Sequence, residues 1–244
     1  MKTLKDLLAY LRDVSSKHGY TCDSCGKEVF DYPNHRLCPA CEDSLLFNDG
    51  NTCEKCGRKT PVVGLCLDCK SYAPKYEKGV SPLVYKGGTP LLINRFKNGN
   101  QRLGYYLGEL TAQAVLRKIP KTETLYVLPV PISRTRLQER GYNQAQVLAQ
   151  TIGDILQRNG YDIAFAFDIM VAGERAPQKD LSYAQRRKLA KATYQVQKRS
   201  ECKGKTFLIV DDILTSGATV NACAEKLLLC GAKTVYLAVA SALC

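Results

Sequence analysis

The sequence predicts an α/β fold in which a mainly parallel sheet with helices on both faces follows a small cysteine-rich module. Two observations support it. From residue 79 onward, short apolar runs alternate with helical patterns, and the first 69 residues contain four Cys-x-x-Cys pairs. A chain of 244 residues can build one full core and a small appendage. We therefore expect an N-terminal helix over residues 1–19, a cysteine module over 20–78 and an α/β domain over 79–244.

The expected elements follow from apolar patterning. Runs rich in β-branched residues predict strands, and apolar side chains at helical spacing predict helices. The expected strands are residues 83–85, 124–130, 165–171, 194–197, 208–210 and 234–240. The expected helices are residues 90–96, 102–118, 142–158, a basic helix within 175–191, and 220–230. Residues 71–81 read as a linker or the approach to a first strand. Such alternation is typical of a parallel sheet covered by helices.

The first residues resemble a short amphipathic helix. Leu4, Leu7, Leu8, Leu11 and Val14 recur at helical spacing among charges of both signs, so we expect packing on the protein rather than membrane docking. The sequence contains neither an apolar stretch of membrane-spanning length nor an export signal. These features predict a cytoplasmic protein without a membrane span.

The cysteine pairs predict metal binding. In a reducing cytosol, two Cys-x-x-Cys pairs supply the four thiolates that structural Zn²⁺ favours, so eight ligands make two zinc sites. The ligands are Cys22, Cys25, Cys38, Cys41, Cys53, Cys56, Cys66 and Cys69. Short intervening loops favour sequential pairing, and interleaved pairing stays open. Redox activity and iron–sulfur ligation are weaker alternatives, because four pairs exceed what a redox site uses.

The most specific motif is LIVDDILTSGAT, residues 208–219. An apolar run ends in Asp211 and Asp212, and a loop of small and hydroxyl residues follows before a helix. The backbone amides of Thr215, Ser216, Gly217, Ala218 and Thr219 can surround a phosphate at the start of that helix. The two carboxylates would repel a phosphate, so they suit ligand hydroxyls or a hydrated Mg²⁺. Helix capping by an Asp is the simpler alternative. Two acids followed by this loop favour a ribose 5-phosphate site.

Positive charge is concentrated after residue 78. The net charge is +12, and residues 20–78 carry eight Lys and Arg against nine Asp and Glu, whereas residues 79–244 carry twenty-three against twelve. We expect a loop after the strand predicted at residues 124–130. This loop carries Arg134, Arg136 and Arg140, whose guanidinium groups suit a pyrophosphate. A second basic run covers residues 175–191. If the protein binds nucleic acid, the α/β domain supplies most of the attraction for phosphates.

Residues 208–219 resemble the PRPP signature of the type I phosphoribosyltransferases, which reads hydrophobic strand, two acids, two variable residues, then T-[ST]-G-x-T. That resemblance implies that Asp211 and Asp212 hold the ribose 2′- and 3′-hydroxyls and that residues 215–219 wrap the 5′-phosphate. In an active enzyme, Asp211 and Asp212 would act as catalytic residues that stabilise charge in the transition state. Arg134, Arg136 and Arg140 would hold the pyrophosphate, which would leave as a Mg²⁺ complex.

The order of motifs along the chain resembles the ComF family of bacterial competence proteins. The motifs are the cysteine pairs, RFKNGN at 95–100, LPVP…ERGYNQA at 128–145, PQKDLSYAQRR at 177–187 and the PRPP signature. The resemblance implies a flexible loop containing Gln178, Arg186 and Arg187. Ala176 stands where a Thr is usual, and Leu189 where an Asn is usual, which weakens the expectation of closed-loop chemistry.

Three functions follow from this resemblance. The first is a competence protein with a PRPP-binding site that handles imported single-stranded DNA beside a helicase partner. The alternative is an active phosphoribosyltransferase that transfers phosphoribose to an unknown small acceptor and releases pyrophosphate. A third is a regulator that only senses PRPP or nucleotides. The sequence shows no identifiable acceptor pocket, so it favours the first.

Overall fold

A computed structural model describes residues 21–121, 123–174 and 183–244. The chain divides into two compact units, one ending at Ser44 and one covering Leu45–Cys244. The second set of cysteines therefore belongs to the same unit as the sheet. The expected helix over residues 1–19 lies outside the described residues, and the boundaries expected at residues 19 and 78 stay a prediction.

The first unit is organised around Cys22, Cys25, Cys38 and Cys41. A bridge between Thr21 and Glu28 closes the first cysteine turn, and the helix α2, Pro39–Asp43, begins directly after Cys38. Arg36 donates to Asp23 at 3.3 Å and to the Tyr32 hydroxyl at 3.0 Å. This short segment has few apolar side chains to bury. Metal binding by its cysteine cluster would supply the stability that an apolar core gives a larger domain.

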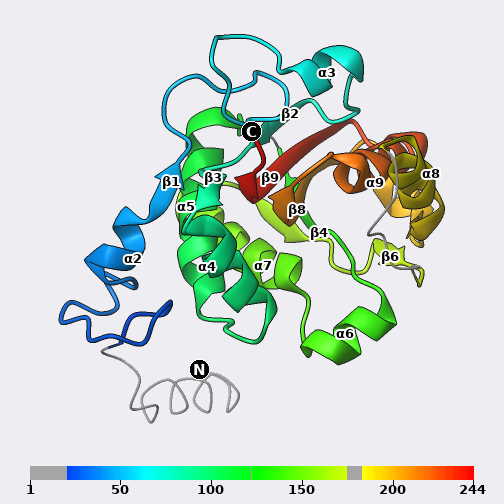
Figure 1. Cartoon of the computed structure of the whole chain (residues 1–244). Helices are drawn as coiled ribbons and strands as arrows, with labels where there is room; N and C mark the ends of the chain where they lie inside the picture. The colour runs from blue at the N-terminus through cyan, green and yellow to red at the C-terminus, as the bar shows by residue number, and fades with distance from the viewer. Residues whose placement is uncertain (1–20, 122, 175–182) are drawn as a thin grey trace. The chain divides into compact units, whose positions relative to one another are not determined.

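The second unit is built on a mainly parallel sheet (Figure 1). The strand order is β1-β3-β9-β8-β4-β5, and β2 pairs with β9 beside β3. Only β1 runs antiparallel to its neighbour in this sheet, among the described residues. The strands are β1 Leu45–Phe47, β2 Lys78–Val80, β3 Leu83–Gly87, β4 Leu125–Pro129, β5 Ile163–Phe165, β8 Thr206–Leu214 and β9 Thr234–Ala242.

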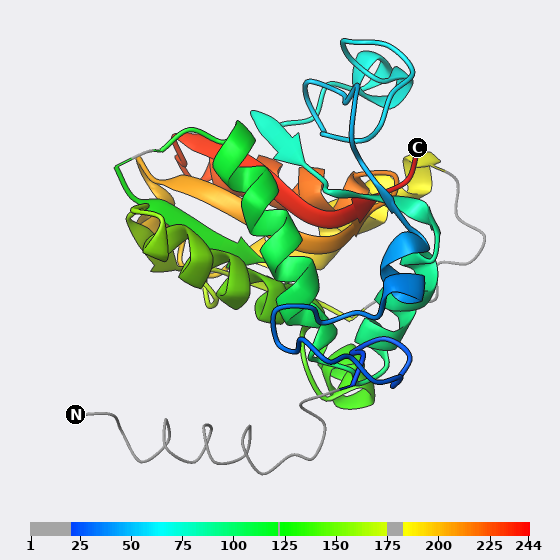
Figure 2. The same cartoon turned by 90° about the vertical axis from the view of Figure 1, so that its left-hand side faces the viewer.

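Helices cover both faces of the sheet, as Figures 1 and 2 show. On one face α5, Leu103–Lys118, packs along β9, while α7, Gln144–Arg158, packs on β4 and β8. On the other face α9, Ala218–Leu229, buries Ala222, Cys223 and Leu227 against Phe207 and Ile209 of β8. Side chains on a strand alternate between faces, so β8 supplies apolar groups to both layers.

Smaller elements complete the unit. The helix α4, Thr89–Lys97, packs on β3, and α6, Arg134–Arg140, follows β4. The strands β6, Met170–Ala172, and β7, Tyr194–Val196, form a separate antiparallel pair. The remaining elements are the helix α3, Leu67–Ser71, the helix α8, Tyr183–Thr193, and the 3₁₀ helix η1, Arg199–Cys202. In the part of the chain described, no helix has both the length and the apolar character needed to cross a bilayer.

The fold class predicted from sequence is confirmed, and three local expectations were wrong. Residues 165–171 form no single strand, because β5 ends at Phe165 in the main sheet and β6 begins at Met170 in the small one. Residues 134–140 form the helix α6, not a loop, since Ser133 caps its first turn. The strand expected at 208–210 extends to Leu214, because β9 pairs with it along its whole length.

Candidate functional site

Asp211 and Asp212 lie within β8, in the half of the strand nearest its carboxyl end. Open parallel sheets bind ligands at this edge. The backbone amide of Asp212 donates to Asp211 Oδ1 at 2.9 Å. Burial, and then the charge of Asp212, raises the pKa of Asp211 to about 8. Asp211 therefore holds its proton well above the usual range of an aspartic acid, until a cation or ligand donor stabilises the carboxylate.

A lysine from α4 faces these carboxylates. Lys97 is the last residue of α4, and its Nζ lies 2.9 Å from Asp212 Oδ2. The helix is fixed because Leu92, Ile93 and Phe96 are buried. The Tyr142 hydroxyl donates to the Phe96 carbonyl, which ties the end of α4 to the segment before α7. Both side chains of the ion pair are largely screened from water, so the pair is stronger than one on the surface.

The arginine segment is positioned by two caps. The Ser133 hydroxyl accepts from the Arg136 amide at 3.4 Å, and Gly141 ends α6 in the left-handed conformation with φ of 75°. Asn143 then caps α7 by accepting from the Ala145 amide, and its side chain also donates to the Val130 carbonyl at 3.1 Å. This last contact joins the start of α7 to the end of β4. Arg136 and Arg140 of α6 are thereby held over the same edge of the sheet.

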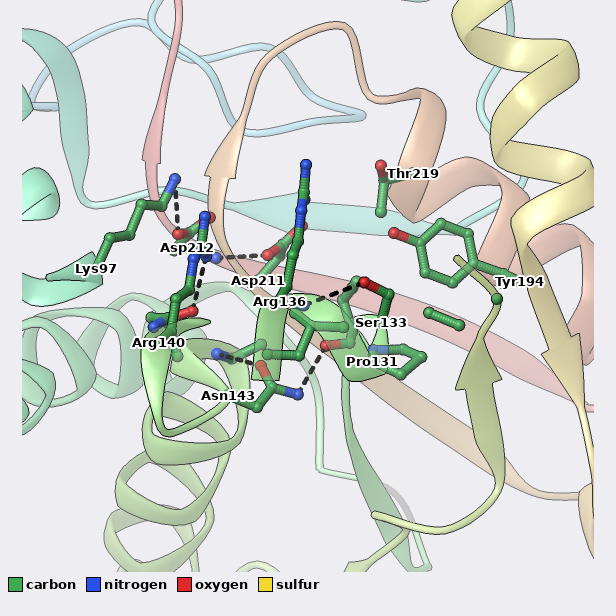
Figure 3. Close-up of a pocket in the computed structure, with 16 residues that line it drawn as sticks. Lys97, Pro131, Ser133, Arg136, Arg140, Asn143, Tyr194, Asp211, Asp212 and Thr219 are labelled. Carbon is green, nitrogen blue, oxygen red and sulfur yellow. Dashed lines mark hydrogen bonds and ion pairs between the residues drawn. The ribbon is translucent and has the colours of Figure 1, made fainter. Parts of the chain in front are cut away.

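These groups meet at one cavity of about 130 Å³ (Figure 3). Lys97, Arg136 and Arg140 bring positive charge to it, and Asp211 and Asp212 bring carboxylates. Arg140 donates to Gln144 Oε1 at 2.9 Å. Gln144 Nε2 is buried and has no hydrogen-bond partner among the described atoms, so it is a donor available to a bound anion. The cavity thus offers donors for phosphate oxygens and acceptors for hydroxyls.

Not every residue predicted for the site lines this cavity. Asp211, Asp212, Thr219, Arg136 and Arg140 do. Ser216 and Gly217 line a separate small cavity beside the second cysteine cluster, Thr215 is exposed, and Ala218 begins α9. Arg136 and Arg140 are four residues apart and lie on one face of α6. Arg134, the first residue of α6, lies on another face, where it is exposed and does not line the cavity.

The predicted flexible loop is described only in part. Gln178 lies outside the described residues. Arg186 and Arg187 belong to α8, and the Arg187 guanidinium lies 3.5 Å from the centre of the Tyr72 ring. Neither lines the cavity between β8 and α6. Tyr194, at the start of β7, does line it.

Sequence reasoning assigned no role to Lys97 or Gln144. Lys97 lies in the motif RFKNGN, and Gln144 lies in the motif ERGYNQA. A lysine at the end of an amphipathic helix is usually solvated, and only the packing of α4 beside β8 brings this one to an aspartate. Gln144 follows the capping Asn143, which places its side chain in the first turn of α7, where an anion is favoured.

The eight N-terminal cysteines gather in the sequential sets that the loop lengths favour. Within each set, all four sulfur atoms lie within 4.8 Å of one another, so each could hold a zinc ion. The Cys69 thiol hydrogen-bonds to Cys56 and lowers the pKa of Cys56 to about 5, while the pKa of Cys69 is raised. Zinc binds deprotonated thiols, so loading this set with zinc would release the protons that these sulfur atoms hold.

Comparison with known proteins agrees with this geometry. Residues 106–242 match the family described as Phosphoribosyl transferase domain. Competence protein ComFC of Bacillus subtilis is 24% identical over 202 residues, which cover 80% of this chain and 79% of that protein. Competence protein F of Haemophilus influenzae is 26% identical over 226 residues, which cover 88% of this chain and 87% of that protein.

The chain belongs to the ComF family of phosphoribosyl transferase domain proteins. Another member, DNA utilization protein YhgH of Escherichia coli O157:H7, is 28% identical over 82% of this chain and 88% of its own length. A solved structure titled "Structure of the allosteric regulatory enzyme of purine biosynthesis" matches with a TM-score of 0.36 and 18% identity. It covers 58% of this chain and 26% of that one. The strand order and the family match of this ComF-family chain indicate a phosphoribosyltransferase-like fold.

Proposed function

We propose that this ComF-family protein is a competence protein that acts in natural transformation. It handles imported single-stranded DNA in the cytosol and binds PRPP or a related ribose phosphate. The observation that carries the ligand assignment is the meeting of two carboxylates and three cationic side chains at one cavity. The DNA assignment follows from the relatives, which are named as competence and DNA utilization proteins.

The cavity and the loop after β8 together suit the different parts of such a ligand. Asp211 and Asp212 accept hydrogen bonds from the ribose 2′- and 3′-hydroxyls, or hold a hydrated Mg²⁺ between them and the pyrophosphate. Residues 215–219 surround the 5′-phosphate at the start of α9. Arg136 and Arg140 pair with pyrophosphate oxygens, and the exposed Arg134 is the third member predicted from sequence. Gln178, Arg186 and Arg187 remain candidates for a loop that covers the ligand.

The two cysteine sets would each hold a structural zinc ion. Four soft thiolates at mutual contact distance suit zinc better than magnesium, which prefers oxygen ligands. Zinc supplies the folding free energy that a small apolar core cannot. Magnesium would belong to the carboxylates of β8, where its charge would lower the pKa of Asp211 and release its proton.

The DNA surface is proposed on the basic groove between α8, η1 and α9. This groove, of about 470 Å³, includes Lys191, Arg199 and Lys226. Lys191 pairs with Glu225 at 2.8 Å, which leaves Arg199 and Lys226 as the main candidates for phosphate contacts. A helicase partner stays a prediction from the family resemblance.

The deciding experiment combines PRPP binding with pyrophosphate release. Calorimetric titration with PRPP and Mg²⁺ should show binding by the intact protein and none by the Asp211→Asn, Asp212→Asn double variant. Pyrophosphate release should stay at background across a panel of nucleobases, with or without single-stranded DNA. The relatives' names do not favour an active transferase, and release with one nucleobase would establish that alternative. Absence of PRPP binding to the intact, zinc-loaded protein would refute the ligand assignment.

A further inference from the structure

The second cysteine cluster, Cys53, Cys56, Cys66 and Cys69, is built into the core of the sheet unit. Cys53, Cys56 and Cys69 belong to the same buried apolar cluster as Ala222 and Cys223 of α9. Gly57, with φ of +74°, lies so close to β2 that a Cβ there would sit 2.5 Å from the Gly79 carbonyl oxygen. A larger residue at position 57 would push the cluster off the sheet. The cluster is therefore packed as part of the sheet unit.

One buried arginine joins this cluster to the loop that follows β8. Arg58 is 8% exposed. Its Nη1 lies 2.7 Å from Asp68 Oδ2, and its Nη2 donates to the Thr215 carbonyl at 2.9 Å. Arg58 lies two residues after Cys56, and Asp68 lies between Cys66 and Cys69. The planar guanidinium thus ties both cysteine turns to the first residue of the predicted phosphate loop.

This contact sets the orientation of the loop backbone. In a planar trans peptide, the carbonyl and the following N–H point in opposite directions. Because Arg58 holds the Thr215 carbonyl toward the cysteine cluster, the Ser216 amide points away from it. The preceding carbonyl, of Leu214, accepts from the Leu243 amide at 3.0 Å. Two successive peptide planes at the start of the loop are fixed in this way.

The first turn of α9 has its own connection to the same region. Asn221 Nδ2 donates to the Tyr72 hydroxyl at 3.1 Å, and Asn221 Oδ1 accepts from the Lys75 amide at 2.7 Å. Asn221 is 5% exposed, so these are buried hydrogen bonds. Residues 72–75 follow the last cysteine of the cluster. The loop between β8 and α9 is therefore held at its start and at its end by residues next to the cluster.

We propose that Arg58 is a positioning residue that couples metal loading of the second cysteine cluster to ribose-phosphate binding at residues 215–219. The inference rests on the proposed function for its ligand, and on Arg58 for its mechanism. Coupling of this kind is reciprocal: if metal in the cluster favours phosphate binding, bound phosphate must retain the metal by the same factor. Metal in the cluster then changes the affinity for the ligand without contacting it.

Reciprocity gives a test that does not depend on turnover. The zinc-loaded protein is mixed with a chelating dye, with and without ribose 5-phosphate, and the release of both zinc ions is followed. At equilibrium with the dye, we expect ribose 5-phosphate to raise the affinity for one zinc by about fivefold or more. Arg58→Met should abolish this protection, and Arg58→Lys should fail to restore it, because an ammonium cannot span both contacts. Asp68→Asn, a second variant in case Arg58→Met does not fold, should weaken the protection.

Arg36→Met is the matched control. Arg36 also pairs with an aspartate beside a cysteine cluster, Asp23 at 3.3 Å, but that cluster is in the other unit. We expect it to keep the full effect of ribose 5-phosphate on zinc release. Equal protection in the wild type and in Arg58→Met would overturn the coupling.

Hydrogen exchange separates this inference from the proposed function. Without ligand, Arg58→Met should speed amide exchange in peptides covering residues 214–219 by about tenfold, and Arg36→Met should not. If the wild type binds neither ribose 5-phosphate nor PRPP, the proposed ligand is wrong and the coupling to it falls as well. Faster exchange in Arg58→Met would then still establish the link to the loop. Unchanged exchange in Arg58→Met would refute Arg58 as a positioning residue.

Discussion

Lys97 Nζ lies 2.9 Å from Asp212 Oδ2, which joins the end of α4 to the middle of the motif in β8. The two residues are far apart in the sequence, and each belongs to a motif that could be read without the other. Lys97 also lowers the pKa of the neighbouring Asp211, against the larger effects of burial and of Asp212. A ligand diol or a hydrated cation that approaches these carboxylates must therefore share Asp212 with Lys97 or displace it.

Replacing Lys97 should change the titration of Asp211. In Lys97→Met the cation is removed, so the pKa of Asp211 should rise further above about 8. Carbon-detected NMR of the aspartate carboxyl groups would measure the shift. Lys86→Met is the control, because Lys86 is an exposed lysine near the end of β3. An unchanged Asp211 titration in Lys97→Met would show that the ion pair does not act on Asp211.

Asp211→Asn should stabilise the protein in a pH-dependent way. The folded-state pKa of Asp211, about 8, lies above its ordinary value of 3.8, so the folded protein binds this proton more tightly than the unfolded chain does. Stability is therefore lost as the pH rises from about 4 to about 8. Asparagine cannot ionise, so the gain in Tm should be absent near the acid limit and largest above about pH 8. Thermal melts across this range would measure it, and a gain independent of pH would contradict it.

Loss of one cysteine should lower the Tm of the sheet unit when the cysteine belongs to the second set, but not when it belongs to the first. Metal analysis should find two zinc ions in the wild type and one in either Cys41→Ser or Cys69→Ser. Cys69 is buried in the core shared with α9, so its substitution should lower the Tm of the sheet unit. Cys41 belongs to the other unit, so Cys41→Ser should leave that transition unchanged. Equal destabilisation by the two variants would show that the sheet unit does not depend on its own cluster.

The basic groove offers a test of DNA binding. Arg199→Glu combined with Lys226→Glu should weaken binding to an unstructured oligonucleotide. It should also reduce the slope of log affinity against log salt by about 0.7 for each phosphate that the protein no longer neutralises. Lys86→Glu is the control, because it makes the same charge change at one site and Lys86 does not line the groove. Fluorescence anisotropy at several salt concentrations would measure both quantities. The same slope in all three proteins would place the DNA-binding surface elsewhere.

Local patterns predicted the elements that have strong apolar periodicity, such as α5, α7 and β9. They failed where pairing partners decide the structure: β8 extends to Leu214 only because β9 runs beside it. The short helix α6 has no apolar stripe to reveal it, and its cap, Ser133, is common in loops as well. For the site, the motif indicated Asp211 and Asp212, while Lys97, Gln144 and Arg58 needed the packing of distant segments. No spacing in the sequence relates Arg58 to Thr215.

The position of the second cysteine cluster decides how the protein can be dissected. A chain shortened to begin at residue 79 would lack Cys53, Cys56, Cys69 and Tyr76 in its core and would also lack an intact strand β2. It would expose the apolar face beneath α9, a surface prone to aggregation. A chain beginning at Leu45 keeps that face covered. Biochemical work on the proposed ribose-phosphate site should therefore use a protein that retains residues 45–78, with zinc present during its production.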